Sequence, residues 1–159
     1  MDYAAMLERL AAIPAFADKK RQKQDMLKVL ECLGNPQKQI RAVHVAGTNG
    51  KGSVCACVNA GLMAAGFKVG LFTSPYLEDF SERIRINGQN APHEQLAEIA
   101  REVFDAADCI NAQITQFGYI TLIAFAFFAR ENTDYAVIEV GLGGTDDPTN
   151  VCMPKVCVI

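Results

Sequence analysis

The sequence predicts an α/β protein built on a P-loop-type doubly wound parallel sheet with flanking helices. Short apolar runs rich in β-branched residues alternate with longer stretches of helical periodicity, the order expected of parallel strands joined by crossover helices. A glycine-rich segment at residues 47–53 separates one such run from the helical stretch that follows. Half of the 159 residues are hydrophobic, so the chain carries enough apolar surface for a packed core.

The N-terminal region is predicted to form two helices. Apolar residues recur at helical spacing across residues 3–13, with Asp2 as the N-cap and Pro14 as the stop. A basic stretch at residues 19–23 is interpreted as a solvated segment. The second helix is expected over residues 24–33, closed by the glycine that follows.

A βαβ unit is predicted next. Residues 40–46 form an apolar run suited to a buried strand, residues 54–65 have a helical pattern, and residues 68–72 form another strand. Parallel strands of this kind need helices over their faces. Residues 73–89 are polar and show no sustained period, so a long surface loop is expected there, and such loops are usually functional.

Two helices and two strands are predicted in the second half of the chain. Pro92 opens a helix with one apolar stripe, and residues 115–130 form a helix that is apolar nearly all round and should be buried. Residues 135–140 form a strand that leads into a glycine-rich turn, and residues 155–159 form one more strand. A buried strand rarely ends a chain, so we expect a sheet cut before it is complete.

The bulk composition narrows the class of function. The net charge of -3 argues against general nucleic-acid binding, which needs a basic surface. The apolar run at residues 120–129 is too short to span a bilayer, so no membrane partner is expected. The six cysteines form no CxxC pair, which is typical of reduced core cysteines in a cytoplasmic protein. His44, inside a predicted strand, is interpreted as a core residue.

The strongest functional signal is VAGTNGKGS at residues 45–53, between a predicted strand and a helix. Glycines allow a tight turn whose N–H groups surround phosphate oxygens, and the helix N-terminus adds a positive dipole end. The residues expected to bind nucleotide are Gly47, Thr48, Asn49, Gly50, Lys51, Gly52 and Ser53. The common pattern is not matched fully, because Val45 replaces its first glycine and Gly52 separates Lys51 from Ser53. The alternative is a glycine-rich turn without a ligand.

The second signal is Glu139, near the carboxyl end of an apolar strand. A carboxylate there is costly to bury unless it is paired or binds a metal. In a parallel sheet that end faces the same crevice as the phosphate loop, where Mg²⁺ on ATP needs one or two carboxylates. Ser74 follows the neighbouring strand and offers a hydroxyl to the metal. The alternative for Glu139 is a structural carboxylate bonded to backbone.

Two further segments offer candidate substrate contacts. In residues 73–88, Arg83 and Arg85 suit an anionic substrate, while Tyr76 and Phe80 suit stacking on a flat ring. The alternative there is solvated charge in a surface loop.

The turn GLGGTDDPTN at residues 141–150 also follows a predicted strand. Its glycines permit close backbone approach, and Asp146, Asp147 and Asn150 offer polar contacts. These residue types favour a turn in any case, which is the alternative interpretation.

Several separated stretches together resemble the folylpolyglutamate synthases, a family whose members often also have dihydrofolate synthase activity. In chain order they are AGTNGKGS, TSPYL with ERIRING, TQFGYIT, and VIEVGLGG with a later TN. The resemblance covers residue 40 to the C-terminus. It implies the central domain of the Mur ligase superfamily and an ATP- and Mg²⁺-dependent ligase. Such a ligase joins L-glutamate to folate or dihydropteroate through an acyl phosphate.

The resemblance also implies site residues. Lys51 and Glu139 are the implied catalytic residues, and Ser74 and Glu139 the implied magnesium ligands. The implied substrate-binding residues are Tyr76, Arg83, Phe117 and Asp147. The chain departs from the family pattern at Gly118, where many members have glutamate, and at Thr145, where many have arginine.

The family continues into a further part of this domain and a C-terminal domain that binds glutamate. Residues 1–159 are therefore expected to be a partial N-terminal ATP-binding domain, inactive alone, of an enzyme that is monomeric at full length. One rival is a cell-wall Mur-type amino-acid ligase, against which the ERIRING segment argues. Another is a module that binds nucleotide or folate without turnover.

Overall fold

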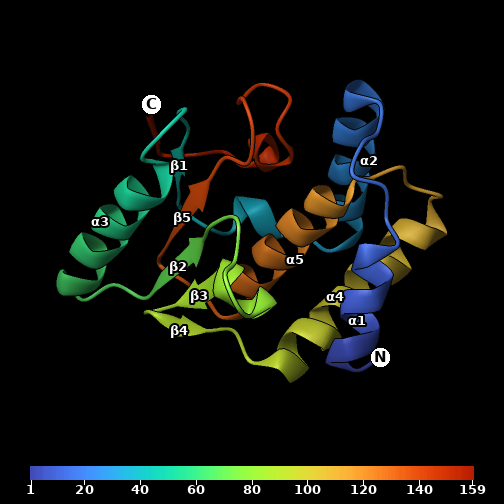
Figure 1. Cartoon of the computed structure of the whole chain (residues 1–159), viewed down its shortest axis with the longest axis horizontal. Coiled ribbons are helices and arrows are strands. Elements are labelled where there is room, and N and C mark those ends of the chain that lie inside the picture. Colours follow the sequence, from blue (N-terminus) through green and yellow to red (C-terminus); the bar gives the residue numbers. More distant parts are fainter.

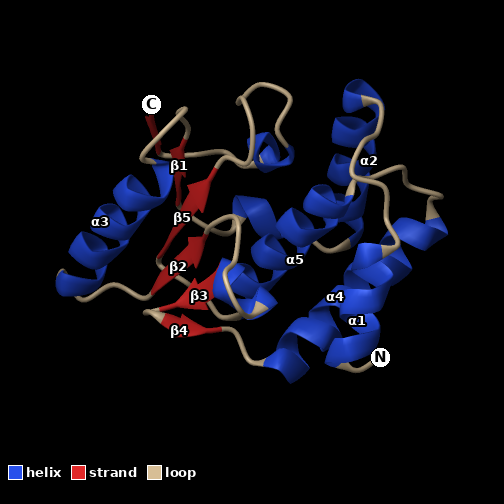
Figure 2. Cartoon of the chain, in the orientation of Figure 1, coloured by secondary structure: helices blue, strands red, loops and turns tan.

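The chain folds around one six-stranded sheet with helices on both faces, in a computed structural model that describes residues 1–159 (Figures 1 and 2). The strand order is β4-β3-β2-β5-β1-β6. Strands β2, β5, β1 and β6 pair in parallel, and β3 and β4 form an antiparallel extension of β2. The predicted α/β class is confirmed. The strands are β1 (Ala42–Val45), β2 (Val69–Phe72), β3 (Ile84–Ile86), β4 (Gln89–Asn90), β5 (Tyr135–Glu139) and β6 (Val156–Val158).

The helices divide unequally between the two faces. One face carries α3 (Lys51–Ala64) alone, whereas the other helices gather on the opposite side of the sheet (Figure 1). These are α1 (Tyr3–Ala11), α2 (Lys19–Cys32), α4 (His93–Cys109) and α5 (Gln116–Arg130). Three short 3-10 helices complete the chain: η1 (Pro36–Lys38), η2 (Phe80–Arg83) and η3 (Pro148–Val151). None of the helices is both long and apolar enough to cross a membrane.

Alternating side chains of the strands build a separate core on each face. Ala42 joins the 30-residue core beneath α4 and α5, whereas Val43 and Val45 join a six-residue core beneath α3. The larger core needs close approach at β2, where a Cβ on Gly70 would lie 2.7 Å from the Phe128 ring of α5. Glycine at this position therefore lets α5 pack directly on the sheet.

Two helices begin earlier than predicted. Helix α2 begins at Lys19, because the Asp18 side chain accepts a hydrogen bond from the Arg21 N–H and caps the helix. The basic stretch at residues 19–23, interpreted as a solvated segment, is thus the first turn of α2, and its lysines and arginine are exposed. Helix α3 begins at Lys51, directly after Gly50, whose φ of 79° turns the chain out of the glycine-rich loop.

The prediction that residues 73–89 form a long surface loop is wrong. This segment holds η2, β3 and the first residue of β4, and β3 pairs antiparallel with β2. Asn87 and Gly88 have φ of 48° and 78°, as a two-residue hairpin turn requires. The polar composition misled the prediction because β4 lies exposed at the sheet edge, while the Asn-Gly pair was the available signal.

Candidate nucleotide and substrate site

The candidate site lies at the carboxyl ends of three neighbouring parallel strands. Strand β1 leads into the glycine-rich loop at residues 47–50, β2 into the segment that begins at Thr73, and β5 into the turn at residues 141–147. Since β2, β5 and β1 are adjacent and parallel, the three segments emerge from the same edge of the sheet. The elements expected to carry the chemistry are thus brought together.

The glycine-rich loop has the backbone that its residues require. Gly47 and Gly50 have φ of 144° and 79°, values that side-chain-bearing residues rarely adopt. Lys51 opens α3, and its Nζ donates to the Gly47 carbonyl oxygen at 3.0 Å, so the lysine side chain folds back along the loop. The first N–H groups of α3 have no acceptor within the helix and form a site suited to an anion.

Glu139 lies between this loop and the segment after β2. The side chain is only 4% exposed, and its Oε2 accepts a hydrogen bond from the Ser74 N–H at 2.8 Å. Its Oε1 lies 3.7 Å from the position of a Cβ on Gly52, beside the glycine-rich loop. The alternative interpretation of Glu139, a structural carboxylate bonded to backbone, therefore holds for Oε2. The other oxygen, Oε1, faces the glycine-rich loop.

The donor set fits a magnesium ion shared with phosphates. Glu139 supplies a carboxylate oxygen beside the glycine-rich loop, and its bonded neighbour Ser74 carries a hydroxyl. No group of three or more His, Cys, Asp or Glu side chains forms a metal site of its own. Mg²⁺ is commonly bound by one or two protein carboxylates together with substrate phosphates and water, so a larger protein cage is not required.

A cavity of about 880 Å³ opens beside Ser74 and extends away from the glycine-rich loop. Five of the residues singled out from the sequence line it: Ser74, Arg83, Phe117, Asp146 and Asp147. Its walls come from segments far apart in the sequence, namely residues 15–22, 74–83, 115–117 and 141–148. The residues of the glycine-rich loop do not line it, so Ser74 and its bond to Glu139 connect the two parts of the site.

Arg83 places an uncompensated positive charge in this cavity. It forms no ion pair, and its Nε is enclosed without a hydrogen-bond partner. The residue is half-buried, and this burial lowers the pKa of its guanidinium from the ordinary value. Tyr76 does not line the cavity; its ring lies 5.0 Å from the Arg83 guanidinium carbon and supports the arginine instead.

Two other candidate substrate contacts from residues 73–88, Phe80 and Arg85, do not lie at the cavity. Phe80 is 6% exposed and belongs to the larger core, so it does not stack on a ligand. Arg85 is in β3 and does not line the cavity. Phe80 lies in η2 and Arg85 in β3, and residue type alone did not distinguish them from Arg83 as cavity residues.

Asp147 organises the turn that follows β5. Its Oδ1 accepts hydrogen bonds from the Thr149 N–H and hydroxyl, and its Oδ2 accepts one from the Leu142 N–H at 2.9 Å. Because the Thr149 hydroxyl donates to Asp147, it accepts from His44 Nε2 at 2.8 Å. Burial lowers the pKa of His44, which agrees with its interpretation as a neutral core residue.

Phe117 is held at the cavity by close packing. Its ring stacks on Phe72 with the centroids 5.8 Å apart. A Cβ on Gly141 would lie 2.6 Å from Phe117 Cε1 and 3.1 Å from Asp147 Oδ2, so glycine at this position lets all three meet. The departure at Gly118 also has a packing reason, since a Cβ there would lie 2.5 Å from Ile114 Cγ2.

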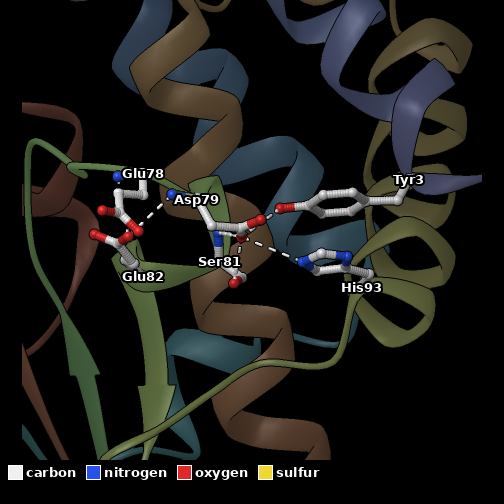
Figure 3. Close-up of polar contacts among 6 residues, drawn as sticks. All are labelled: Tyr3, Glu78, Asp79, Ser81, Glu82 and His93. Carbon is white, nitrogen blue, oxygen red and sulfur yellow. Dashed lines mark hydrogen bonds and ion pairs between the residues drawn. The ribbon is translucent and has the colours of Figure 1, made fainter.

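A polar cluster fixes the segment that carries Ser74 and Arg83 against α1 (Figure 3). The Asp79 Oδ1 accepts hydrogen bonds from Tyr3, Ser81 and His93, whose side chains converge on it. The Tyr3 and His93 rings stack with their centroids 3.7 Å apart. These bonds, led by that of the Ser81 hydroxyl, lower the pKa of Asp79 to about 2.

Glu82 completes the local order of the same segment. Its two carboxylate oxygens accept hydrogen bonds from the backbone N–H groups of Leu77, Glu78 and Asp79. These bonds lower the pKa of Glu82, because they favour the ionised carboxylate. The Glu82 carboxylate is thus bonded to the backbone of the segment, and Asp79 to Tyr3, Ser81 and His93, and neither forms an ion pair with Arg83.

Sequence reasoning missed the wall formed by residues 15–22. Phe16 is 92% exposed at the cavity, and Lys19 reaches across to Asp146 in an exposed ion pair of 3.3 Å. Gln22 accepts a hydrogen bond from the Thr115 N–H, a contact between residues 93 positions apart. No periodicity or motif in the segment signals these contacts, because they depend on the docking of α2 beside α5.

The mixed sheet, its helices and the glycine-rich loop after β1 define an α/β protein of the Mur-ligase-like class. Within that class, the chain is homologous to part of the folylpolyglutamate and dihydrofolate synthases. It is 38% identical over 164 residues to folylpolyglutamate synthase of Lacticaseibacillus casei, spanning all of this chain and 38% of that protein. It is 41% identical over 139 residues to dihydrofolate synthase/folylpolyglutamate synthase of Bacillus subtilis, spanning 84% of this chain and 32% of that protein.

Solved structures give the same result. The apo form of the L. casei synthase matches 99% of this chain and 39% of its own, with a TM-score of 0.93 and 37% identity. A folylpolyglutamate synthase complex with AMPPCP and folate matches with the same TM-score and 38% identity, over 99% of this chain and 39% of that one. No protein-family model matches the chain. The chain thus spans less than two fifths of the length of these relatives.

Proposed function

We propose that this chain is the ATP-binding portion of an ATP- and Mg²⁺-dependent ligase that adds L-glutamate to folate. The observation that carries the proposal is the bond between Glu139 and Ser74, which joins a glycine-rich phosphate loop to a cavity with an unpaired arginine. The similarity to folylpolyglutamate synthases, including one in complex with AMPPCP and folate, supports the choice of ligands. The same chemistry would produce dihydrofolate if dihydropteroate were the acceptor.

The nucleotide part is residues 47–53. Their backbone N–H groups and the positive end of α3 receive the phosphate oxygens, while Lys51 leaves the Gly47 carbonyl and contacts the β- and γ-phosphates. Glu139 and Ser74 would hold the magnesium ion that accompanies the nucleotide. Bound magnesium would neutralise charge that develops on the transferred phosphoryl group.

The substrate part is the cavity. We assign Phe117 and the neighbouring glycine-rich turn to contact with the flat ring of folate, Asp147 to its N–H donors and Arg83 to an anionic group. Tyr76 contributes by fixing Arg83 through its ring face. The uncompensated charge of Arg83 supports this assignment, since a partly buried guanidinium gains most from an anion when no protein carboxylate neutralises it.

The reaction then proceeds in two steps. A folate carboxylate oxygen bonds to the γ-phosphorus while the bond from that phosphorus to ADP breaks. The glutamate amino group attacks the acyl carbon, loses a proton and displaces phosphate, which leaves an amide. In the first step Lys51 and the loop N–H groups stabilise negative charge, the principal contribution that a protein makes to phosphoryl transfer.

The proposal extends to the organisation of the enzyme. Residues 1–159 supply the nucleotide part, and a further domain supplies the glutamate site; the larger length of the relatives supports this division. We place the enzyme in the cytoplasm as a monomer that binds neither nucleic acid nor membrane. The six unpaired cysteines support a reducing compartment, and the net charge of -3 supports the absence of a nucleic-acid partner.

Calorimetric titration of Mg-ATP into the chain tests the nucleotide part. Lys51→Ala should weaken affinity by about tenfold to a hundredfold, as expected for a hydrogen bond to a charged group of about 1.5–3 kcal/mol. The exposed lysine Lys38, in η1, provides a matched control, and Lys38→Ala should leave affinity unchanged. Equal affinities of wild type and Lys51→Ala would refute the phosphate assignment.

A further inference from the structure

Gln22 presents an amide donor to the cavity in a fixed orientation. The residue is 5% exposed, and its Oε1 accepts a hydrogen bond from the Thr115 N–H at 2.9 Å. A backbone N–H can only donate, so the amide oxygen must face Thr115 and the Nε2 must point away from it. Gln22 and Thr115 both line the cavity, and Gln22 Nε2 makes no hydrogen bond within the chain.

An unused donor on so buried a residue is uncommon, because buried polar groups are nearly always paired. Gln22 Nε2 is not among the four enclosed side-chain atoms that lack a partner, which places it at the cavity surface rather than within the packed wall. Gln37 provides a contrast. It is equally buried, but its Nε2 donates to Asn35 and it does not line the cavity.

The cavity also offers an acceptor and an apolar face. The Asp147 Oδ2 accepts only the Leu142 N–H and retains capacity for another donor. Phe117 supplies a flat aromatic surface beside it. A flat heterocycle whose edge carries N–H donors next to a carbonyl oxygen would match this set, with the carbonyl directed to Gln22.

We propose that Gln22 is a specificity-determining residue, whose Nε2 donates a hydrogen bond to the carbonyl oxygen of the substrate's pterin ring. The inference rests on the proposed function, because it takes folate as the occupant of the cavity. Gln22 thereby selects a ring with an oxygen at this position over a ring with an amino group. The amino group would place its own N–H donors against the Nε2 donor of Gln22. Thr115 acts through Gln22 by fixing the orientation of its amide.

The test compares the binding of folate and of its 4-amino analogue, aminopterin, by calorimetry with the whole chain. Wild type should bind folate at least about tenfold more tightly, since an unmatched polar pair in a buried site costs about 1–3 kcal/mol. Gln22→Glu keeps an oxygen for the Thr115 N–H and turns an acceptor toward the ring, so the preference should reverse. Gln22→Met should abolish the preference without reversing it, and Gln37→Glu should leave it as in wild type.

The outcomes separate the inference from the proposed function. A wild type that binds folate with no preference, or a Gln22→Glu variant that keeps the wild-type ratio, overturns the role of Gln22 and leaves the folate site standing. A wild type that binds neither ligand overturns both. Thermal unfolding identifies a variant that does not fold; in that event Gln22→Met decides, and an unchanged ratio overturns the inference.

Discussion

The glycine-rich loop and the cavity beside it are built in different ways. The loop is one contiguous segment, residues 47–53, and its properties follow from backbone conformation at two glycines and from the start of α3. The cavity is assembled from segments as far apart in the sequence as residues 15–22 and 141–148, which meet only when α2, α5 and the strands pack together. Local sequence therefore encodes the proposed phosphate site, whereas tertiary packing creates the proposed substrate site.

The hydrophobic cores beside the loop and beside the cavity differ in size. The loop leads into α3, which covers a core of six buried residues, whereas the cavity borders the core of 30 beneath the other helices. Changes in packing should accordingly affect the cavity more than the loop.

The largest effect is expected from Gly70→Ala, because the new Cβ would lie 2.7–2.9 Å from three atoms of the buried Phe128 ring. Neither the strand nor the ring has free space, so the free energy of unfolding should fall by about 1–3 kcal/mol. Urea denaturation measures this change. Gly61→Ala is the control, since a Cβ there meets nothing within 4 Å, and it should not destabilise the chain. Equal stability of the two variants would contradict the close packing of α5 on β2.

A smaller and more local effect is expected from Gly141→Ala. Its Cβ would displace the edge of the Phe117 ring and approach Asp147, so the cavity should change shape while the glycine-rich loop does not. Folate affinity should fall by about fivefold to tenfold, the loss of one aromatic contact, and Mg-ATP affinity should stay the same. Parallel titrations of both ligands measure the effect. A matching loss of Mg-ATP affinity would show that the two parts are not built independently.

The smallest effect is expected from Asp79→Asn, which weakens the cluster that holds the segment after β2 against α1. The folded-state pKa of Asp79, about 2, lies below the ordinary value of 3.8. Its ionised form therefore stabilises the fold above about pH 4, and this contribution is lost as the pH falls through about 2.

Because the Asp79 side chain is 40% exposed, solvent screening reduces this contribution to about 1 kcal/mol. Denaturation at pH 7 should show Asp79→Asn less stable than wild type by that amount, and the difference should shrink between pH 4 and pH 2. A difference that does not depend on pH would indicate lost packing rather than lost charge.

The same contrast explains what the sequence could predict. The order of strands and helices, the glycine-rich loop and Glu139 follow from local patterns, and the structure places Arg83, Phe117 and Asp147 around one cavity. Gln22 escaped prediction because its partner is remote in sequence.

The misplaced elements have local causes. The start of α2 was missed because the run of charges at residues 19–23 was interpreted as a solvated segment and Asp18 was not considered as an N-cap. The hairpin at β3 and β4 was missed because exposed edge residues are polar, although the turn residues Asn87 and Gly88 were present. In both cases a single capping or turn residue was a better guide than composition.

The most direct test of the central claim, that Glu139 joins the phosphate loop to a metal site, is the magnesium dependence of ATP binding. Calorimetric titrations of ATP with and without magnesium should be made on wild type and on Glu139→Gln, whose amide oxygen still accepts from the Ser74 N–H. Magnesium should strengthen binding to wild type by at least about tenfold, equivalent to about 1.4 kcal/mol, and should have little effect on the variant. The same magnesium dependence in both proteins would contradict the claim.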